Sequence, residues 1–405
     1  MVADGCTDDT LRTLSGYEDK LRLQILEQEA RGPAAARNTG ARQAQAPLLI
    51  FLDDDVEVLP NFVQAHLIAH SVINHLPDQV VIGYLPPRLL SQFGFFHAEL
   101  TGWWEQMFDR MRKPGYRFRY SDLLTGNLSL PRSLFWQVGG FDERFRVHED
   151  YELGYRLLRV GARLSFYPQA YGYHHEGTNL DGAMQRKYQE GKADVLLGRL
   201  YPDLRSDLLM TRLDRYSLLP SRVLRWLAFH LPSLGEVSTR LLLLVLSFAQ
   251  KTRFLRLWQR LLYGLFAYHY WRGVAEEMGN RKALRCFLSV GKPLSQTSSL
   301  AIDLADGPSL AARLQQAVDL VEQHHPEQVK LYYQGEYIGC LPAIPGSEPL
   351  RGAHLLPVLA EEFAIPLLHA MARDPAFPLA AGAPHLIELC KRELREHPIY
   401  EFPEA

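Results

Sequence analysis

The sequence predicts an α/β protein in which a sheet is flanked by helices, followed by a helical region and a small α+β module. Apolar runs of strand length, such as residues 48–52 and 80–84, alternate with helical segments, such as residues 61–73 and 93–111. A short continuous apolar run is typical of a strand buried on both faces. After residue 203 the pattern changes to segments rich in Leu, Trp, Phe and Arg, which favour amphipathic helices.

Three adjacent carboxylates follow the first of these strands. The apolar run at residues 48–52 leads directly into Asp53, Asp54 and Asp55. Adjacent like charges are costly unless a cation lies among them, and open α/β sheets bind ligands at the carboxyl ends of their strands. A hard divalent cation, held by carboxylate oxygens and completed by a phosphate group, explains the pattern. The alternative is a solvated acidic turn.

Composition limits the class of protein. At 405 residues the chain can bury more than one core, so we expect two domains. The formal charge of −2 gives no general attraction to nucleic acid. The cysteines Cys6, Cys286, Cys340 and Cys390 are far apart, which predicts thiols in a reducing compartment, without a zinc site or disulfide. The longest uninterrupted apolar run, residues 241–249, is about half the length of a membrane span, and we expect no signal peptide in the first residues.

A second group of polar residues follows later in the chain. Gly126 and Asn127 interrupt an apolar segment, which indicates a bulge or a close approach of the backbone to a ligand. Glu149 and Asp150 open a predicted helix, where they could cap its N-terminus or, beside the acidic strand end, supply a general base. His174 belongs to a His-His pair, which is either incidental or completes the shell of a divalent ion.

Two helical segments carry further candidates. In the helix that begins at Gly32-Pro33, Arg37 lies one turn from Ala41, on a face that could point at the mouth of the acidic strand. The alternative is a solvated arginine. Trp103 and Trp104, in the segment 93–111, are either a stacking platform for a sugar or part of the core.

Residues 1 to about 200 resemble the family 2 glycosyltransferases, which have the GT-A fold. The resembling motifs occur in the family's order and approximate spacing. They are Ala-Asp-Gly-Cys-Thr-Asp at residues 3–8 (the usual form has Ser for Cys6), Gly-x-x-x-Ala-Arg-Asn-x-Gly at 32–40, Phe-Leu-Asp-x-Asp at 51–55, Gly-Asn-Leu-Ser at 126–129, Gly-Gly-Phe-Asp-Glu-Arg-Phe at 139–145 and Glu-Asp-x-Glu-Leu-Gly-x-Arg-Leu at 149–157. The resemblance implies a GT-A (Rossmann-like) mixed sheet over residues 1–202.

The same resemblance implies an enzyme that moves a sugar from a nucleotide-sugar donor, expected to be a UDP-sugar, to an acceptor hydroxyl with inversion. Asp4 would contact the base and Asp53 the ribose or diphosphate, while Asp55 and His174 would bind Mg or Mn. Asp150 would be the catalytic base, positioned by Glu149. The acceptor would be a saccharide or lipid-linked, as in bacterial cell-envelope polysaccharide synthesis. Further donor contacts are expected from Arg37, Asp54, Gly126 and Asn127.

One departure from the family pattern supports an alternative function. Family members place a strand, a helix and a second strand before the Asp-Gly turn, and here that turn is at Asp4-Gly5. We therefore expect a domain without its first strand, and the alternative is a non-catalytic glycosyltransferase-like protein whose C-terminal half binds a partner or a membrane. A divalent-dependent phosphohydrolase is a third hypothesis, but it leaves the Asn-Leu-Ser and Glu-Asp motifs unused.

The second half carries no catalytic motif. Arginines punctuate the apolar stripes of residues 203–292, which suits either peripheral contact with the inner face of a membrane or a helical subdomain packed on the core of a cytoplasmic protein. Residues 293–307 are polar and predict a linker. The module at residues 308–405 is expected to contain helices at 310–324, 350–372 and 384–395 and a hairpin at 329–342, with a role in binding or assembly.

Overall fold

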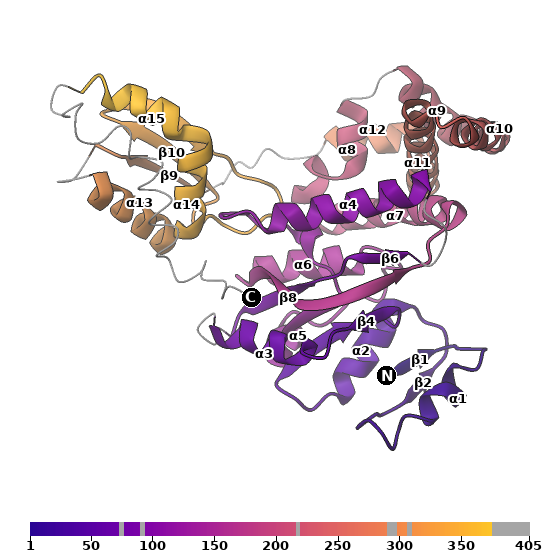
Figure 1. Cartoon of the computed structure of the whole chain (residues 1–405). Coiled ribbons are helices and arrows are strands. Elements are labelled where there is room, and N and C mark those ends of the chain that lie inside the picture. Colours follow the sequence, from indigo (N-terminus) through magenta and orange to yellow (C-terminus); the bar gives the residue numbers. More distant parts are fainter. Residues whose placement is uncertain (73–76, 90–93, 216–218, 290–297, 306–309, 375–405) are drawn as a thin grey trace. The chain divides into compact units, whose positions relative to one another are not determined.

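The computed structural model describes residues 1–72, 77–89, 94–215, 219–289, 298–305 and 310–374. The chain divides into two compact units (Figure 1). Unit 1 comprises Met1–Gln106 and Tyr120–Lys292, and unit 2 comprises Met107–Arg119 and Pro293–Ala405. The helical region that we expected as a separate segment at residues 203–292 therefore groups with the sheet, and a short segment from the first half groups with the C-terminal module.

Unit 1 is built on a mixed sheet of six strands. Their order is β3-β7-β5-β8-β4, with β6 also paired to β8. Strands β5 and β6 run parallel to β8, whereas the β3–β7, β5–β7 and β4–β8 pairs are antiparallel. This confirms the predicted mixed sheet. The strands are β3 (Leu48–Leu52), β4 (Val56–Val58), β5 (Gln79–Tyr84), β6 (Pro87–Leu89), β7 (Asn127–Pro131) and β8 (Arg163–Glu176).

Strand β3 forms from the apolar run at residues 48–52, but the expectation that it is buried on both faces is wrong. Leu49 and Phe51 are buried, whereas Leu52 is exposed. The reason is its place in the sheet, because β3 is the outer strand of the hydrogen-bonded order. The centrally placed β5 has the continuous burial that we expected, since Val80, Val81 and Ile82 have no exposed surface.

A separate two-stranded sheet carries the first motif. Strand β1 (Val2–Asp4) pairs in parallel with β2 (Leu26–Gln28). Helix α1 (Thr10–Ser15) lies between them in the chain, and helix α2 (Pro33–Gln43) packs against both strands. Residues 16–22 form turns, and β2 begins only at Leu26.

Helices flank the main sheet, as predicted. Helix α3 (Phe62–Val72) packs Ala65 and Ala69 against Val81, Tyr167 and Ala170 of the sheet. Small residues at this face let the helix approach the strands closely. The other elements of this region are α4 (Phe95–Met111), the 3₁₀ helix η1 (Tyr120–Asp122), α5 (Arg132–Gln137) and α6 (Glu149–Arg159).

A helical layer completes unit 1. Its two long helices, α7 and α11, meet at glycines, since a Cβ atom at Gly191 would lie 2.1 Å from the Tyr270 carbonyl oxygen and one at Gly273 would lie 1.9 Å from that of Tyr188. Helix α10 is long and apolar enough to cross a membrane by length and composition, although the uninterrupted apolar run within it is short. The elements are α7 (Leu180–Leu200), the 3₁₀ helix η2 (Pro202–Ser206), α8 (Leu209–Arg215), α9 (Leu219–His230), α10 (Pro232–Lys251), α11 (Leu255–Met278) and α12 (Arg281–Ser289).

Unit 2 contains a three-stranded sheet in the order β11-β10-β9. The predicted hairpin is present, and β9 adds to it in parallel although we expected a linker there. The helix predicted at residues 384–395 lies outside the described residues. The elements are β9 (Ser299–Asp303), α13 (Leu310–His324), β10 (Gln328–Tyr333), β11 (Glu336–Leu341), α14 (Gly352–Val358), the π-helical turn η3 (Leu359–Phe363) and α15 (Ala364–Met371).

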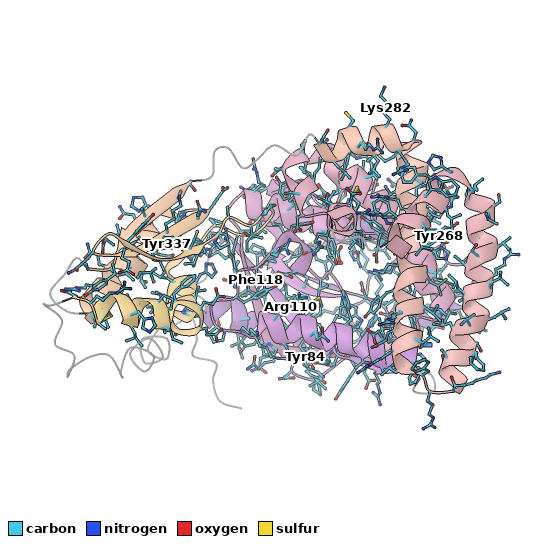
Figure 2. The ribbon with its side chains drawn as sticks, turned by 90° about the horizontal axis from the view of Figure 1, so that it is seen from above. Tyr84, Arg110, Phe118, Tyr268, Lys282 and Tyr337 are labelled. Atoms are coloured by element: carbon cyan, nitrogen blue, oxygen red, sulfur yellow. The ribbon has the colours of Figure 1, made fainter. Side chains whose placement is uncertain are left out.

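Segment 107–119 joins unit 2 through the half-buried guanidinium of Arg117. It donates to the carbonyl oxygens of Glu348 and Pro342 at 2.7 Å each and to that of Glu327 at 3.2 Å. The Phe118 amide donates to the Glu348 carboxylate at 2.9 Å. These partners lie more than 200 residues away along the chain, which explains why sequence patterns assigned the segment to the first half (Figure 2 labels Phe118).

Candidate active site

The acidic run Asp53–Asp55 connects two strands of the sheet and is fixed at both ends. The Asp53 amide donates to the Gly126 carbonyl oxygen at 3.2 Å, and the Asp55 carbonyl oxygen accepts from the His175 amide at 2.8 Å. The run therefore spans from the end of β3, beside β7, to the start of β4, beside β8. The side chain of Asp54, between them, is exposed.

Arg37 joins the acidic run to the helix that carries Glu149 and Asp150. Its guanidinium donates to Asp53 Oδ1 and to Glu149 Oε1 at 2.7 Å each. Burial favours the neutral form of Arg37, but the two carboxylates outweigh it and raise its pKa. The fork of a guanidinium suits such a double contact. The interpretation that Arg37 faces the acidic strand end, rather than solvent, is therefore the one the structure supports.

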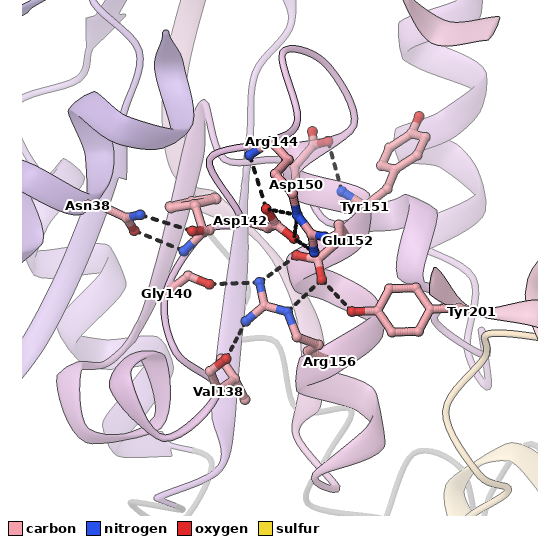
Figure 3. Close-up of polar contacts among 11 residues, drawn as sticks. Asn38, Val138, Gly140, Asp142, Arg144, Asp150, Tyr151, Glu152, Arg156 and Tyr201 are labelled. Carbon is pink, nitrogen blue, oxygen red and sulfur yellow. Dashed lines mark hydrogen bonds and ion pairs between the residues drawn. The ribbon is translucent and has the colours of Figure 1, made fainter. Parts of the chain in front are cut away.

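Asp150 lies at the first turn of α6 in a setting that favours a proton. Burial and the neighbouring charge of Glu149 raise its pKa to about 6, although the charges of His148 and Arg186 oppose the rise. Its Oδ1 accepts from the Tyr151 amide at 2.8 Å (Figure 3). A carboxylate with this pKa is ionised at neutral pH and can still accept a proton from a hydroxyl.

His148 supports Asp150 from the preceding position and was not singled out in the sequence. It has a left-handed backbone, with φ of 61°. Its ring stacks on Tyr151 with centroids 4.3 Å apart, and its Nδ1 lies 3.1 Å from the buried Asp194 of α7. Burial lowers the pKa of His148, but Asp194 outweighs this and raises it. No local pattern reveals this contact, because Asp194 lies on a helix that follows much later.

Asp55 and His174 lie together, as the metal-site prediction requires. The distance from Asp55 Oδ2 to His174 Nε2 is 3.2 Å, and Glu176 Oε2 lies 3.6 Å from His174 Nδ1. Hydrogen bonds and charge from Asp55 and Glu176 raise the pKa of His174 to about 10, despite its burial. Glu176 was not assigned from the sequence, although the period of two along a strand places it on the same face as His174.

These donors fit a divalent ion of the Mg or Mn type in chemistry, but they form only part of a coordination shell. Carboxylate oxygen and neutral imidazole nitrogen are ligands for such ions, so the ion would have to replace the proton that Asp55 and Glu176 favour on His174. Among the described residues, no group of three His, Cys, Asp or Glu side chains is close enough to hold a metal. Asp55 and His174 would hold the ion, and phosphate or water would have to supply its other ligands.

Gly126 and Asn127 contribute to this edge in different ways. A Cβ atom at Gly126 would lie 2.7 Å from Asp53 Oδ2, so glycine lets the carboxylate approach the backbone of β7. Asn127 is fully buried, and its amide group donates to the Ala170 carbonyl oxygen at 2.8 Å. Its Oδ1 lies 2.8 Å from His66 Nε2. The Asn127 side chain therefore belongs to the scaffold of the sheet, and its expected contact with the nucleotide-sugar stays a prediction.

Asp4 belongs to the other sheet, and three donors already engage its carboxylate. They are the Gln28 side chain at 2.7 Å and the Arg31 and Gly32 amides at 2.8 and 2.6 Å. Burial favours the neutral form of Asp4, but these bonds outweigh it and lower its pKa. The carboxylate thus fixes the loop that begins α2, and its contact with a base stays a prediction.

Residues from three of the sequence motifs, at 32–40, 139–145 and 149–157, form scaffold contacts (Figure 3). The buried Glu152 accepts from Arg156 Nε at 2.7 Å and from the Tyr201 hydroxyl at 2.5 Å. Arg156 also donates to the carbonyl oxygens of Val138 and of Gly140, the latter at 2.7 Å. The Asn38 amide exchanges two bonds of 2.9 Å with the backbone of Phe141. These contacts tie the segment 138–141 to α6 and to α2.

A surface cavity lies at the opposite end of α6 from Asp150. Its volume is about 370 Å³, and its lining includes Tyr155, Arg159, Tyr201 and Asp203. Because its lining contains none of the predicted site residues, we do not assign it to the active site.

Comparison with known families places two models on this part of the chain. Residues 1–139 match the model described as glycosyl transferase family 2. Residues 105–177 match the model described as the N-terminal domain of galactosyltransferase.

Curated relatives cover part of the chain. Validoxylamine A glucosyltransferase from Streptomyces hygroscopicus subsp. jinggangensis is 39% identical over 208 residues, which is 44% of this chain and 48% of that protein. Pre-mycofactocin glycosyltransferase from Mycobacterium tuberculosis is 28% identical over 191 residues, or 45% of this chain and 38% of that protein. The matched region therefore spans less than half the length of each of these relatives.

Solved structures match at lower identity. The mannosyltransferase PcManGT from Pyrobaculum calidifontis, in complex with GDP-Man and Mn²⁺, is 15% identical with a TM-score of 0.42, over 67% of this chain and 76% of that chain. S. aureus TarS 1-349 is 17% identical with a TM-score of 0.36, over 68% of this chain and 80% of that chain.

Proposed function

Because this chain belongs, through its N-terminal part, to glycosyl transferase family 2, we propose that it moves a sugar from a nucleotide-sugar donor to an acceptor hydroxyl with inversion. The observation that carries this proposal is the bridge from Asp53 through Arg37 to Glu149, with both contacts at 2.7 Å. It joins the end of β3, where a diphosphate would bind, to the start of α6, where Asp150 would act as base.

The residues divide the work between leaving group and nucleophile. Asp55 and His174 would hold the divalent ion, which when bound neutralises the negative charge of the departing diphosphate. Asp53 and Arg37 would orient the donor. The acceptor oxygen forms its bond to the anomeric carbon from the face opposite the diphosphate, and the bond from that carbon to the phosphate oxygen breaks with its electron pair. Asp150 takes the proton of the acceptor hydroxyl.

The donor is proposed to be a UDP-sugar, and calorimetric titration with UDP, with and without Mn²⁺, is the first test. We expect UDP to bind only when Mn²⁺ is present. Asp55→Ala should abolish the metal-dependent binding, whereas Asp150→Asn should bind UDP as the natural sequence does and lose sugar transfer. Glu57→Gln is a matched control, since Glu57 is an exposed carboxylate two residues beyond Asp55.

The outcomes separate the competing functions. If the folded protein binds no UDP in either condition, the proposal fails in favour of a non-catalytic glycosyltransferase-like protein. If Asp55→Ala and Asp150→Asn both leave transfer unchanged, the site assignment is wrong. A phosphohydrolase would release inorganic phosphate from UDP with the Asp55 site alone, and Asp150→Asn would not affect that release.

A further inference from the structure

Helix α10 has an apolar face that no described part of the chain covers. Leu244 and Phe248 are 69% and 64% exposed. Further exposed apolar residues follow at spacings of three and four, which places them on the same face of the helix. This exposed stripe consists of Leu234, Val237, Leu241, Leu244, Val245 and Phe248.

The exposed stripe is distinct from the face with which α10 packs on its neighbours. The packed face consists of Gly235, Thr239, Leu246 and Ala249, all buried. At the start of α10, the Tyr268 hydroxyl of α11 donates to the Pro232 carbonyl oxygen at 3.0 Å (Figure 2 labels Tyr268). Figure 1 shows α10 beside α9 and α11. The exposed stripe is therefore on a different face of α10 from the residues that pack on the neighbouring helices.

The sequence of α10 and its flanking helices is rich in basic residues. Between residues 219 and 275 the sequence has eight Arg and Lys residues and a single acidic residue, Glu236, in a chain whose formal charge is −2. Arg240 and Lys251 are exposed along α10. The turn into α11 exposes Phe254 and Leu255 between basic neighbours. Apolar side chains bordered by basic ones suit the interface of an anionic bilayer.

We propose that α10 and the turn into α11 bind the surface of an anionic phospholipid bilayer. The helix lies in the plane of the interface, with the exposed stripe among the upper acyl chains and the basic residues at the lipid phosphates. This goes beyond sugar transfer and does not depend on it, since the surface uses none of the donor-site residues.

The same observations argue against two other occupants. A two-fold interface between two copies would bring the same patch together from both sides, so Arg240, Lys251 and their neighbours would face like charges with only Glu236 to offset them. A membrane-spanning α10 would have to leave its packed face with α9 and α11 and take Glu236 and Arg240 into the hydrocarbon.

Flotation of the full-length chain with vesicles tests the proposal. We expect it to float with phosphatidylcholine vesicles that contain about 30% phosphatidylglycerol, and to bind pure phosphatidylcholine at least tenfold more weakly. Raising NaCl from about 0.1 M to about 0.5 M should weaken the binding, because salt screens the basic residues.

Variants assign the binding to the exposed stripe. The double variant Leu244→Ser, Phe248→Ser should lose at least tenfold in binding to anionic vesicles. The matched control is Val63→Ser, Leu67→Ser, because these residues are 57% and 53% exposed on α3 and lie outside the stripe. The control should float as the natural sequence does, and circular dichroism should show both variants folded.

Three results would overturn the proposal. The first is equal flotation of the stripe variant and the natural sequence. The second is a stable dimer in light scattering that the stripe variant abolishes, together with no binding to vesicles, which would assign the face to a second copy. The third is resistance of the vesicle-bound protein to extraction at alkaline pH, which would show a spanning helix.

Discussion

Replacing Arg37 by methionine should destabilise unit 1, because it leaves a buried carboxylate without its partner. The Arg37 and Glu149 side chains are only 17% and 10% exposed, and their contact is 2.7 Å. Removing one partner of a buried ion pair costs about 3–5 kcal/mol. The loss of the contact between Arg37 and Asp53 costs less stability, because Asp53 is 34% exposed and water can solvate its carboxylate. We therefore expect Arg37→Met to cost about 3 kcal/mol.

Urea unfolding, followed by circular dichroism and tryptophan fluorescence, measures this cost. With an m-value of about 2–3 kcal/mol per molar, the midpoint should fall by about 1–1.5 M. Arg42→Met is the matched control on the same helix, because Arg42 is exposed and lies 3.7 Å from Glu143. We expect the control to lose no more than about 0.5 kcal/mol.

A second substitution identifies the source of the cost. Glu149→Gln in the Arg37→Met background removes the unpaired buried charge and should recover at least about 1 kcal/mol. The reasoning is refuted if Arg37→Met unfolds at the same urea concentration as Arg42→Met. It is also refuted if Glu149→Gln worsens the single variant.

Three further predictions concern protons and packing. Burial lowers the pKa of His66 to about 4 from its usual 6.5, so the stability that neutral His66 provides is complete above pH 6.5 and is lost as the pH falls towards 4. Urea midpoints should reveal a loss of up to roughly 3 kcal/mol in the free energy of unfolding. A flat profile between pH 7 and 4 would contradict this prediction. Because the pKa of Asp150 is raised to about 6, the transfer rate should fall about tenfold per pH unit below that value, whereas a fall that starts only near pH 4 would exclude it as the base. Gly273→Ala places a Cβ 1.9 Å from the Tyr188 carbonyl oxygen and should lower the free energy of unfolding in urea by about 3 kcal/mol. Gly102→Ala, whose Cβ would have nothing within 4 Å, should raise it by about 0.5–1 kcal/mol. Equal urea midpoints for the two variants would contradict the packing argument.

Local pattern predicted strands β3 and β5 and the placement of the acidic run, but it missed β9 and could not separate site residues from scaffold residues. Arg37 and Asn38 are neighbours in one motif, yet the helix turns about 100° between them. One contacts the carboxylates of the site, and the other pairs with the backbone of Phe141. Similarly, Asn127 lies beside Gly126 in one motif, but its buried side chain contacts His66 of α3 and the Ala170 carbonyl oxygen of β8.

Contacts between distant segments explain the remaining differences. His148 depends on Asp194, and segment 107–119 depends on carbonyl groups more than 200 residues away. Neither relation leaves a periodic or compositional trace in the sequence. His174 and Glu176 are the exception, since their spacing of two on one strand could have identified Glu176 beforehand.

The double role of the Glu-Asp-x-Glu motif has a consequence for engineering. A mutagenesis library aimed at new donors would normally randomise every motif position near the base. Here Glu152 and Arg156 hold the backbone of Val138 and Gly140, so most library members altered there would fail to fold and would be scored as inactive. Diversity is better placed at Asp54, whose side chain is exposed. A campaign designed in this way would screen for specificity instead of sampling unfolded chains.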